Sequence, residues 1–172
     1  YEDLRWAAFR RALHSYGDYL VHDLHDSLHR QEYIRRLITN LATYPEENPG
    51  LYRFIASDPI DLEAVPEDIL LSVSSMKAWL FDVIEVAHAP RIEPATARRV
   101  SNIVLAYIDG ETLNLINGRV VPGEDVKGRV VENALHMIEK LGEPVVDAQP
   151  SADSADPVPY PALDLSGVER LN

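Results

Sequence analysis

The positions of the 12 prolines constrain the fold of this 172-residue chain more than any other feature. Proline breaks the interior of a helix but is accepted in its first turn, so each long proline-free block is a place for a helix. Four such blocks cover residues 1–44, 67–89, 95–121 and 123–143. Strand signals are weak, since no alternating apolar run adjoins a two-residue hairpin turn. The chain is therefore expected to be all-α, with about six helices.

Apolar residues within these blocks recur every three or four positions, which is the spacing of an amphipathic helix. The expected helices cover 2–28, a second stretch around 33–41 and a short segment over 51–56, and three more open at Pro66, Pro94 and Pro122. The helix that opens at Pro66 is expected to bury an apolar face that includes Leu70, Val73, Met76 and Leu80.

Residues 143–172 differ in composition from the preceding body. They contain five prolines and six acidic residues against one arginine, so 1 − 6 gives −5 of the formal net charge of −12. Such a composition is typical of an extended or disordered segment. Leu163, Leu165 and Val168 are its candidate docking residues. The sequence thus predicts a helical domain over 1–142 followed by an acidic, proline-rich tail over 143–172.

Charge and residue usage exclude several classes of function. A net charge of −12 argues against direct binding of nucleic acid by this segment. The absence of cysteine excludes disulfides and thiolate chemistry and favours a cytoplasmic location. No apolar run approaches the length of a membrane span. The chain has no phosphate-binding glycine loop, dinucleotide fingerprint or serine nucleophile elbow, so neither an enzyme nor a cofactor is expected.

Four of the six histidines fall in the first block, at His14, His22, His25 and His29. On a single helix they lie opposite the apolar stripe, and spacings of three and four residues would let neighbouring imidazoles share a metal ion. A solvent-exposed polar face or a pH-sensitive surface accounts for the same residues, and no H-E-x-x-H arrangement is present. No metal is therefore predicted, with His22, His25 and His29 as the alternative ligand set.

Small residues recur every four positions at Ala106, Gly110, Asn114 and Gly118. A glycine inside a helix costs about 1 kcal/mol relative to alanine, so this groove indicates close approach of another helix. That helix belongs either to the same domain or to a dimer partner. Aromatic residues mixed with hydroxyls and amides on other helices are typical of a small-molecule pocket, although packing of the core alone explains most of them.

The late sequence combines the apolar run Ile103–Gly110, which ends in Asp-Gly, with Gly118, Pro122 and the amphipathic stretch Val126–Leu141. This order resembles the C-terminal half of regulators of the tetracycline-repressor (TetR) family. Their penultimate helix carries an apolar run ending in Asp-Gly, and a final helix follows after a short loop. The opening Glu2–Leu4 is similar to the step at which that family's DNA-binding domain passes into its linking helix.

The resemblance implies a cytoplasmic, all-helical regulatory domain that binds a small apolar or aromatic effector. It also implies a homodimer in which the last two helices of each copy form a four-helix bundle. The family's helix-turn-helix is not in this chain, so operator DNA would be bound only through a missing N-terminal domain. The implied ligand-binding residues are Tyr44, Phe54, Met76, Trp79, Leu80 and Tyr107. The implied dimer interface comprises Tyr107, Gly110, Asn114, Val130, Ala134 and Ile138.

The leading hypothesis is therefore the effector-binding and dimerisation part of a small-molecule-responsive transcriptional regulator. In this hypothesis the first helix transmits ligand binding to two DNA-binding heads. One alternative is a stand-alone helical metal or small-molecule binding protein that uses the face with His14, His22, His25 and His29. A third is an interaction module in which the supposed pocket is only core.

Overall fold

A computed structural model of the protein describes residues 2–25, 28–56, 64–88, 92–141 and 162–163. Within these ranges the chain forms six α-helices and no strand, which confirms the all-α fold expected from the sequence. The helices are α1 (Glu2–Val21), α2 (Arg30–Glu47), α3 (Pro49–Ala56), α4 (Glu67–His88), α5 (Pro94–Ile116) and α6 (Val126–Leu141). None of them is long and apolar enough to cross a lipid bilayer.

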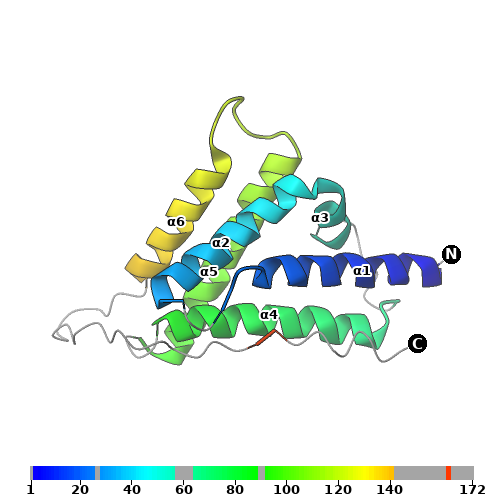
Figure 1. Ribbon diagram of the computed structural model, residues 1–172, viewed down its shortest axis with the longest axis horizontal. Helices are drawn as coiled ribbons and strands as arrows, with labels where there is room; N and C mark the ends of the chain where they lie inside the picture. The colour runs from blue at the N-terminus through cyan, green and yellow to red at the C-terminus, as the bar shows by residue number, and fades with distance from the viewer. Residues whose placement is uncertain (1, 26–27, 57–63, 89–91, 142–161, 164–172) are drawn as a thin grey trace.

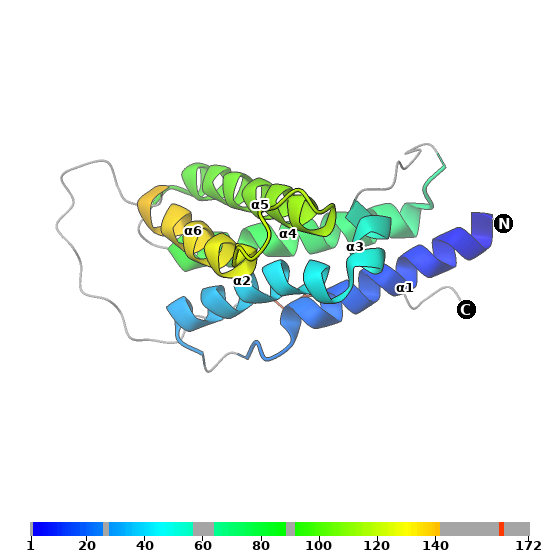
Figure 2. The same cartoon turned by 90° about the horizontal axis from the view of Figure 1, so that it is seen from above.

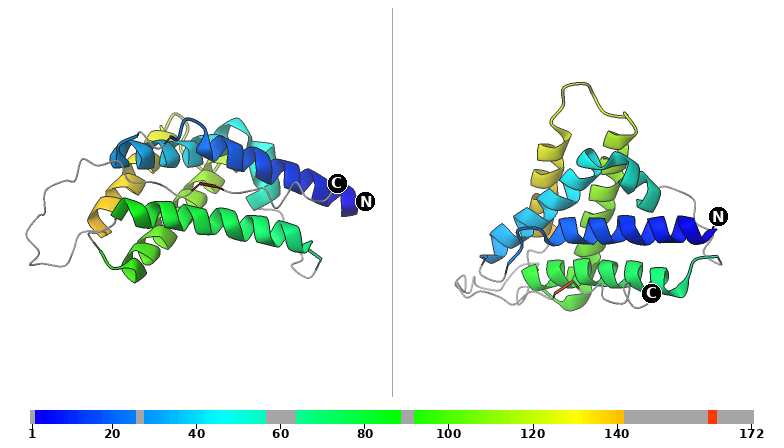
Figure 3. Two further views of the ribbon diagram at one scale, coloured as in Figure 1. Left: turned by 60° about the horizontal axis from the view of Figure 1, so that its bottom comes forward. Right: turned by 45° about the vertical axis from the view of Figure 1, so that its right-hand side comes forward.

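The helices pack in two groups. α1 and α4 run in the same direction, with their first turns at the same end of the molecule, while α2, α5 and α6 cross obliquely beside them (Figures 1 and 3). Seen from above, α1 and α2 lie on one side and α5 lies on the other (Figure 2). The short helix α3 contacts both α1 and α2, so the corner between α2 and α3 sits against the first helix.

Side chains from all six helices form one hydrophobic core. Large side chains that are less than 2 % exposed include Leu20, Leu37, Ile69, Ile108 and Val130, one from each of five helices. All of these residues belong to the apolar series that predicted the helices. The periodicity of the sequence therefore identified most of the core correctly.

The first turns of α4 depart from the expected pattern. Leu70 and Val73, which were expected to be buried, are each 41 % exposed. Ile69, which belongs to the same expected face, and Ser72 face the core instead, with exposures of 2 % and 7 %. Because successive helical residues are rotated by about 100°, turning these two residues inward turns Leu70 and Val73 outward.

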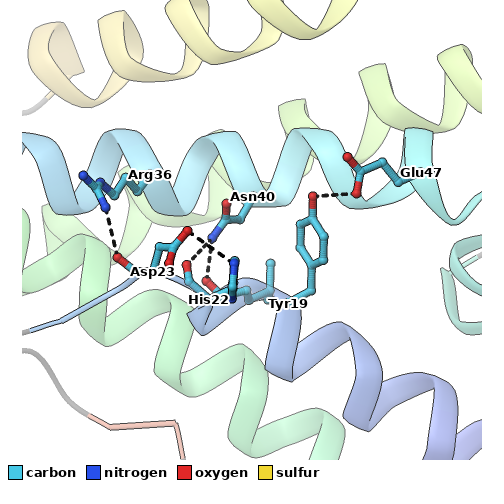
Figure 4. Close-up of polar contacts among 7 residues, drawn as sticks. Tyr19, His22, Asp23, Arg36, Asn40 and Glu47 are labelled. Atoms are coloured by element: carbon cyan, nitrogen blue, oxygen red, sulfur yellow. Dashed lines mark hydrogen bonds and ion pairs between the residues drawn. The ribbon is translucent and has the colours of Figure 1, made fainter.

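The first helix ends earlier than predicted, at Val21 rather than at residue 28. Asp23 adopts a left-handed conformation with φ of 59°, which a continuous right-handed helix does not allow. Asn40 of α2 donates hydrogen bonds to the backbone carbonyls of Leu20 and His22, each at 3.1 Å. Figure 4 shows these contacts holding the turn between α1 and α2. The prediction of one helix over 2–28 is therefore wrong.

Two other helix boundaries differ from the proline pattern. α2 continues through Pro45, which is less than 2 % exposed, so burial of the ring offsets the backbone donor that proline lacks. The last helix begins at Val126 rather than at Pro122. Asp125 fixes this start, because its side-chain Oδ1 accepts a 2.9 Å hydrogen bond from the backbone N–H of Gly128.

The tail is described only at Ala162 and Leu163. Leu163 is partly buried and packs against the hydrophobic core, which confirms it as a docking residue. Figure 1 shows this short red segment beside α4. The other two candidate docking residues, Leu165 and Val168, lie outside the described residues.

Candidate functional site

Four tyrosines from three helices meet beside the corner between α2 and α3. Tyr16 and Tyr19 lie on α1, Tyr44 lies on α2 and Tyr52 lies on α3. The Tyr16 ring centroid is 4.8 Å from that of Tyr44 and 5.9 Å from that of Tyr52. Tyr19 packs edge-on to Tyr44 at 5.2 Å. We call these four residues the tyrosine cluster.

Local structure positions the cluster. The break between α2 and α3 is short, because Asn48 closes α2 through its N–H to the Tyr44 carbonyl at 2.8 Å. The Asn48 carbonyl then accepts the Tyr52 N–H at 2.9 Å and so begins the next helix. This exchange turns the chain sharply and places Tyr44 and Tyr52 both in contact with the Tyr16 ring.

A carboxylate and a hydroxyl of α5 complete the site. The Tyr52 hydroxyl donates a 3.0 Å hydrogen bond to Asp109 Oδ1 and lies 3.4 Å from the Thr112 hydroxyl. Tyr52 and Thr112 are buried, at 2 % and 1 % exposure. Asp109 is exposed on the surface of α5, with its carboxylate turned toward Tyr52. The site therefore joins a buried aromatic interior to an acidic group at its edge.

The pKa values of three tyrosines are raised, first of all by burial. The pKa of Tyr16 lies well above its ordinary value, and the facing groups of Tyr52, Asp109 and Tyr44 raise it further. Burial followed by the charge of Asp109 raises the pKa of Tyr52. Burial and a 2.9 Å hydrogen bond to Glu47 raise the pKa of Tyr19 to about 12. These hydroxyls consequently keep their protons at neutral pH and act as hydrogen-bond donors.

The pKa of Asp109 is raised above the ordinary value of an aspartate. Burial of its carboxyl group raises the pKa, while the hydrogen bond from Tyr52 and the charge of Lys77 on α4 lower it. Partial burial of the carboxyl group against Tyr52 has the largest effect, so the pKa of Asp109 is raised overall. Groups of this kind are enriched at functional sites.

The hydroxyl of Tyr44 is buried without a hydrogen-bond partner among the described residues. Tyr44 is 1 % exposed, so bulk water does not reach its side chain. More than nine in ten buried polar groups have a partner, and an unsatisfied one costs about 1–3 kcal/mol. The tyrosine cluster therefore holds one hydrogen-bonding group that its own structure leaves unused.

The ligand-binding residues implied by the TetR resemblance do not all gather here. Tyr44 belongs to the cluster, whereas Phe54 packs against Phe9 of α1 with ring centroids 5.6 Å apart. Tyr107 accepts a 3.0 Å hydrogen bond from the Asn133 side chain and joins α5 to α6 instead. The remaining three, Met76, Trp79 and Leu80, are buried core residues of α4.

The sequence does not identify Tyr16, Tyr19, Tyr52 or Asp109 as site residues. Tyr16 falls within the apolar spacing of the first block, and Asp109 falls within the Asp-Gly step. Tyr52 falls within the short segment expected to be helical over 51–56. Tyr52 and Asp109 are 57 positions apart in the chain, so no local spacing signals their contact.

The implied dimer residues divide into two groups. Gly110 is exposed, and Tyr107, Asn114 and Ile138 are half-buried, so all four present surface on α5 and α6. Val130 and Ala134 are 1 % and 0 % exposed and pack inside the protomer. Their side chains are therefore unavailable to a second copy, and the surface that remains for a dimer excludes them.

The small-residue groove on α5 has more than one origin. A Cβ atom at Gly110 would meet no atom within 4 Å, so no close approach inside the protomer requires glycine there. Gly118 has φ of 68° and ends α5, so its backbone conformation accounts for the glycine. Packing inside the protomer is thus not the reason for Gly110, whereas a contact with another copy remains a reason.

The histidines do not share one helical face, because the first helix ends at Val21. His14 pairs with Asp18 at 3.6 Å, and His22 pairs with Asp23 at 3.3 Å. His29 precedes the first residue of α2 and shares no helix with His22. In the part of the chain that the structure describes, no three His, Asp or Glu side chains are grouped closely enough to hold a metal ion.

We compared the chain with known proteins to look for relatives with the same site. No protein-family model matches it, and neither a curated protein nor a solved structure shows a significant match. The function of this chain must therefore be inferred from its own residues.

Proposed function

We propose that this chain is the effector-binding and dimerisation part of a small-molecule-responsive transcriptional regulator similar to those of the TetR family. The observation that carries the proposal is the tyrosine cluster with its buried Tyr44 hydroxyl, which has no hydrogen-bond partner among the described residues. A site with apolar walls and a few converging polar groups is the usual form of a small-molecule pocket. An effector would complete the missing hydrogen bond.

The position of the cluster supports a regulatory role. Tyr16 and Tyr19 are residues of α1, so an effector among the tyrosines would contact the first helix directly. Arg10 of α1 also pairs with Asp68 at the start of α4, with Nη2 and Oδ1 3.0 Å apart. A shift of α1 would therefore be shared with α4. Regulation requires only that the effector binds one arrangement of these helices better than the other.

The outer surface of α5 and α6 supports dimerisation. Ile103 is 44 % exposed and Leu141 is 43 % exposed, and half-buried Tyr107 and Ile138 lie on the same two helices. Gly110 would let a partner helix approach closely. In the proposed dimer these two helices meet their copies in a four-helix bundle. In this proposal operator DNA is bound by a DNA-binding domain outside residues 1–172.

The test uses the full-length gene product and the DNA immediately upstream of its gene. A thermal-shift screen of small molecules first selects the compound that stabilises the protein most. Fluorescence anisotropy then measures DNA affinity with and without that compound, and sedimentation equilibrium gives the oligomeric state. A dimer whose DNA affinity changes with the compound supports the proposal. A monomer, or a protein whose DNA affinity is the same with saturating compound, would contradict it.

A further inference from the structure

The two described residues of the C-terminal tail differ in their exposure. Ala162 is exposed, whereas Leu163 is partly buried and packs against the hydrophobic core. Leu163 follows Leu141, the last residue of α6, by 22 positions in the sequence. The tail is acidic and rich in proline, a composition that does not form a core by itself. Leu163 is therefore an apolar anchor that joins a largely polar segment to the helical body.

The anchor lies where α1 and α4 face each other. Figure 1 shows the red segment at the edge of α4, near the middle of that helix, and the left view of Figure 3 shows it between α1 and α4. Both helices contribute side chains to the core against which Leu163 packs, among them Leu13 of α1 and Trp79 of α4. An apolar side chain at this place adds contact at the seam between the two helices.

The other described contacts between α1 and α4 are limited. α1 packs mainly against α2 and α3, and its contact with α4 is smaller. The ion pair between Arg10 and Asp68 links the two helices near the start of α4, but its side chains are 28 % and 14 % exposed. Ion pairs that solvent reaches contribute little to stability. An apolar anchor at this seam therefore has a large share in holding α1 and α4 together.

We propose that Leu163 is an intramolecular clasp that fixes α1 against α4, so that the C-terminal tail controls the position of the first helix. While Leu163 is in place, the seam between α1 and α4 opens rarely. When Leu163 is withdrawn, α1 moves apart from α4 more readily. This inference concerns the chain itself and goes beyond the proposed function, because it requires neither an effector nor DNA.

The test measures amide hydrogen exchange, helix by helix, in the whole 172-residue chain and in its Leu163→Ser variant. Residue 163 lies outside the helices that are measured, so the intrinsic exchange rates of their amides stay the same. We expect the amides of α1 and α4 to exchange about fivefold faster, because loss of a partly buried leucine side chain shifts a local opening equilibrium by a factor of that order. α6 packs on α2 and α5, so its exchange is expected to be unchanged.

Two further variants serve as controls. Ala162→Ser introduces the same hydroxyl at the exposed neighbouring position and is expected to leave exchange unchanged in every helix. Leu163→Met keeps an apolar side chain of similar volume and is expected to retain the slow exchange of α1 and α4. Together the two controls separate loss of the apolar anchor from a general effect of substitution in the tail.

The pattern over the helices decides the proposal. Equal acceleration in all six helices would show that Leu163 only contributes to global stability, and would refute the clasp. Acceleration of α4 without α1 would show that Leu163 covers α4 alone, and would also refute it. Unchanged exchange on Leu163→Ser, or an equal effect of Ala162→Ser, would exclude an anchor at this residue. The dimer and DNA measurements on the full-length product decide the proposed function separately.

Discussion

Replacement of Tyr44 by phenylalanine is the most direct test of the structure of the site. The substitution removes only the hydroxyl, which is buried and has no partner in the described part of the chain. In the unfolded chain the hydroxyl is hydrated, so folding strips its water without replacing the hydrogen bond. The desolvation cost of such a group is about 1–3 kcal/mol, and loss of the oxygen's packing contacts offsets part of it. We expect Tyr44→Phe to raise the free energy of unfolding by about 1 kcal/mol.

The matched control is Tyr52→Phe in the same cluster. This hydroxyl donates to Asp109 at 3.0 Å and adjoins Thr112 at 3.4 Å, so its removal deletes a hydrogen bond to a charged group. Hydrogen bonds of that kind contribute about 1.5–3 kcal/mol, so Tyr52→Phe is expected to destabilise the fold by about 2 kcal/mol. The same chemical change is thus predicted to have opposite signs at two tyrosines within one cluster.

Urea unfolding followed by tryptophan fluorescence measures both effects, and Trp6 and Trp79 are both buried reporters. For a domain of this size, 1 kcal/mol corresponds to a shift of about 2–4 °C in Tm, which thermal unfolding checks independently. A loss of stability on Tyr44→Phe comparable to that on Tyr52→Phe would refute the reasoning. It would show that the Tyr44 hydroxyl is satisfied within the free protein, for instance by a bound water molecule.

Further predictions concern charge and assembly. Burial raises the pKa of Asp109 in the folded chain, so the contribution of this carboxyl group to stability is present at acidic pH and is lost as the pH rises through that pKa. Asp109→Asn is therefore expected not to lower Tm at neutral pH, and a lower Tm would contradict this. Arg10 lowers the pKa of Asp68 by hydrogen bonding, so this pair stabilises the fold above the pKa that Asp68 has in the unfolded chain, and the stabilisation is lost in acid. A double-mutant cycle with Arg10→Met and Asp68→Asn should give a coupling energy of about 1 kcal/mol at neutral pH and none in strong acid. Gly110→Leu should abolish the proposed dimer in sedimentation equilibrium while leaving the protomer folded, since the protomer leaves space at this position, and an intact dimer would exclude the proposed face.

The sequence by itself determined the class of fold and the extent of most helices. Prolines and apolar periodicity located α4 and α5 almost to the residue, at Glu67–His88 and Pro94–Ile116. Both signals are local, since a helix is decided by residues within a turn or two of one another. Composition likewise predicts an acidic tail over 143–172 without reference to any contact.

The end of the first helix shows where local information fails. Leu24 and Leu28 continue the apolar spacing of α1, so the pattern predicts that the helix extends to residue 28. The chain turns at Val21 because Asn40, about twenty residues later, holds two carbonyls of the turn. The apolar periodicity indicates that these leucines favour burial, but it does not indicate whether a helix or a turn carries them into the core.

Only the tertiary structure decided the composition of the candidate site. The resemblance to TetR regulators implied Tyr44 as a ligand contact, but Tyr16, Tyr52 and Asp109 lie on three other helices and share no spacing in the sequence. Packing of α1 against the corner of α2 and α3 brings these groups into contact with α5. Their pKa values, and the missing partner of the Tyr44 hydroxyl, depend on burial and on atoms that are distant in the chain. Such properties arise from three-dimensional packing, which short-range patterns in a sequence do not encode.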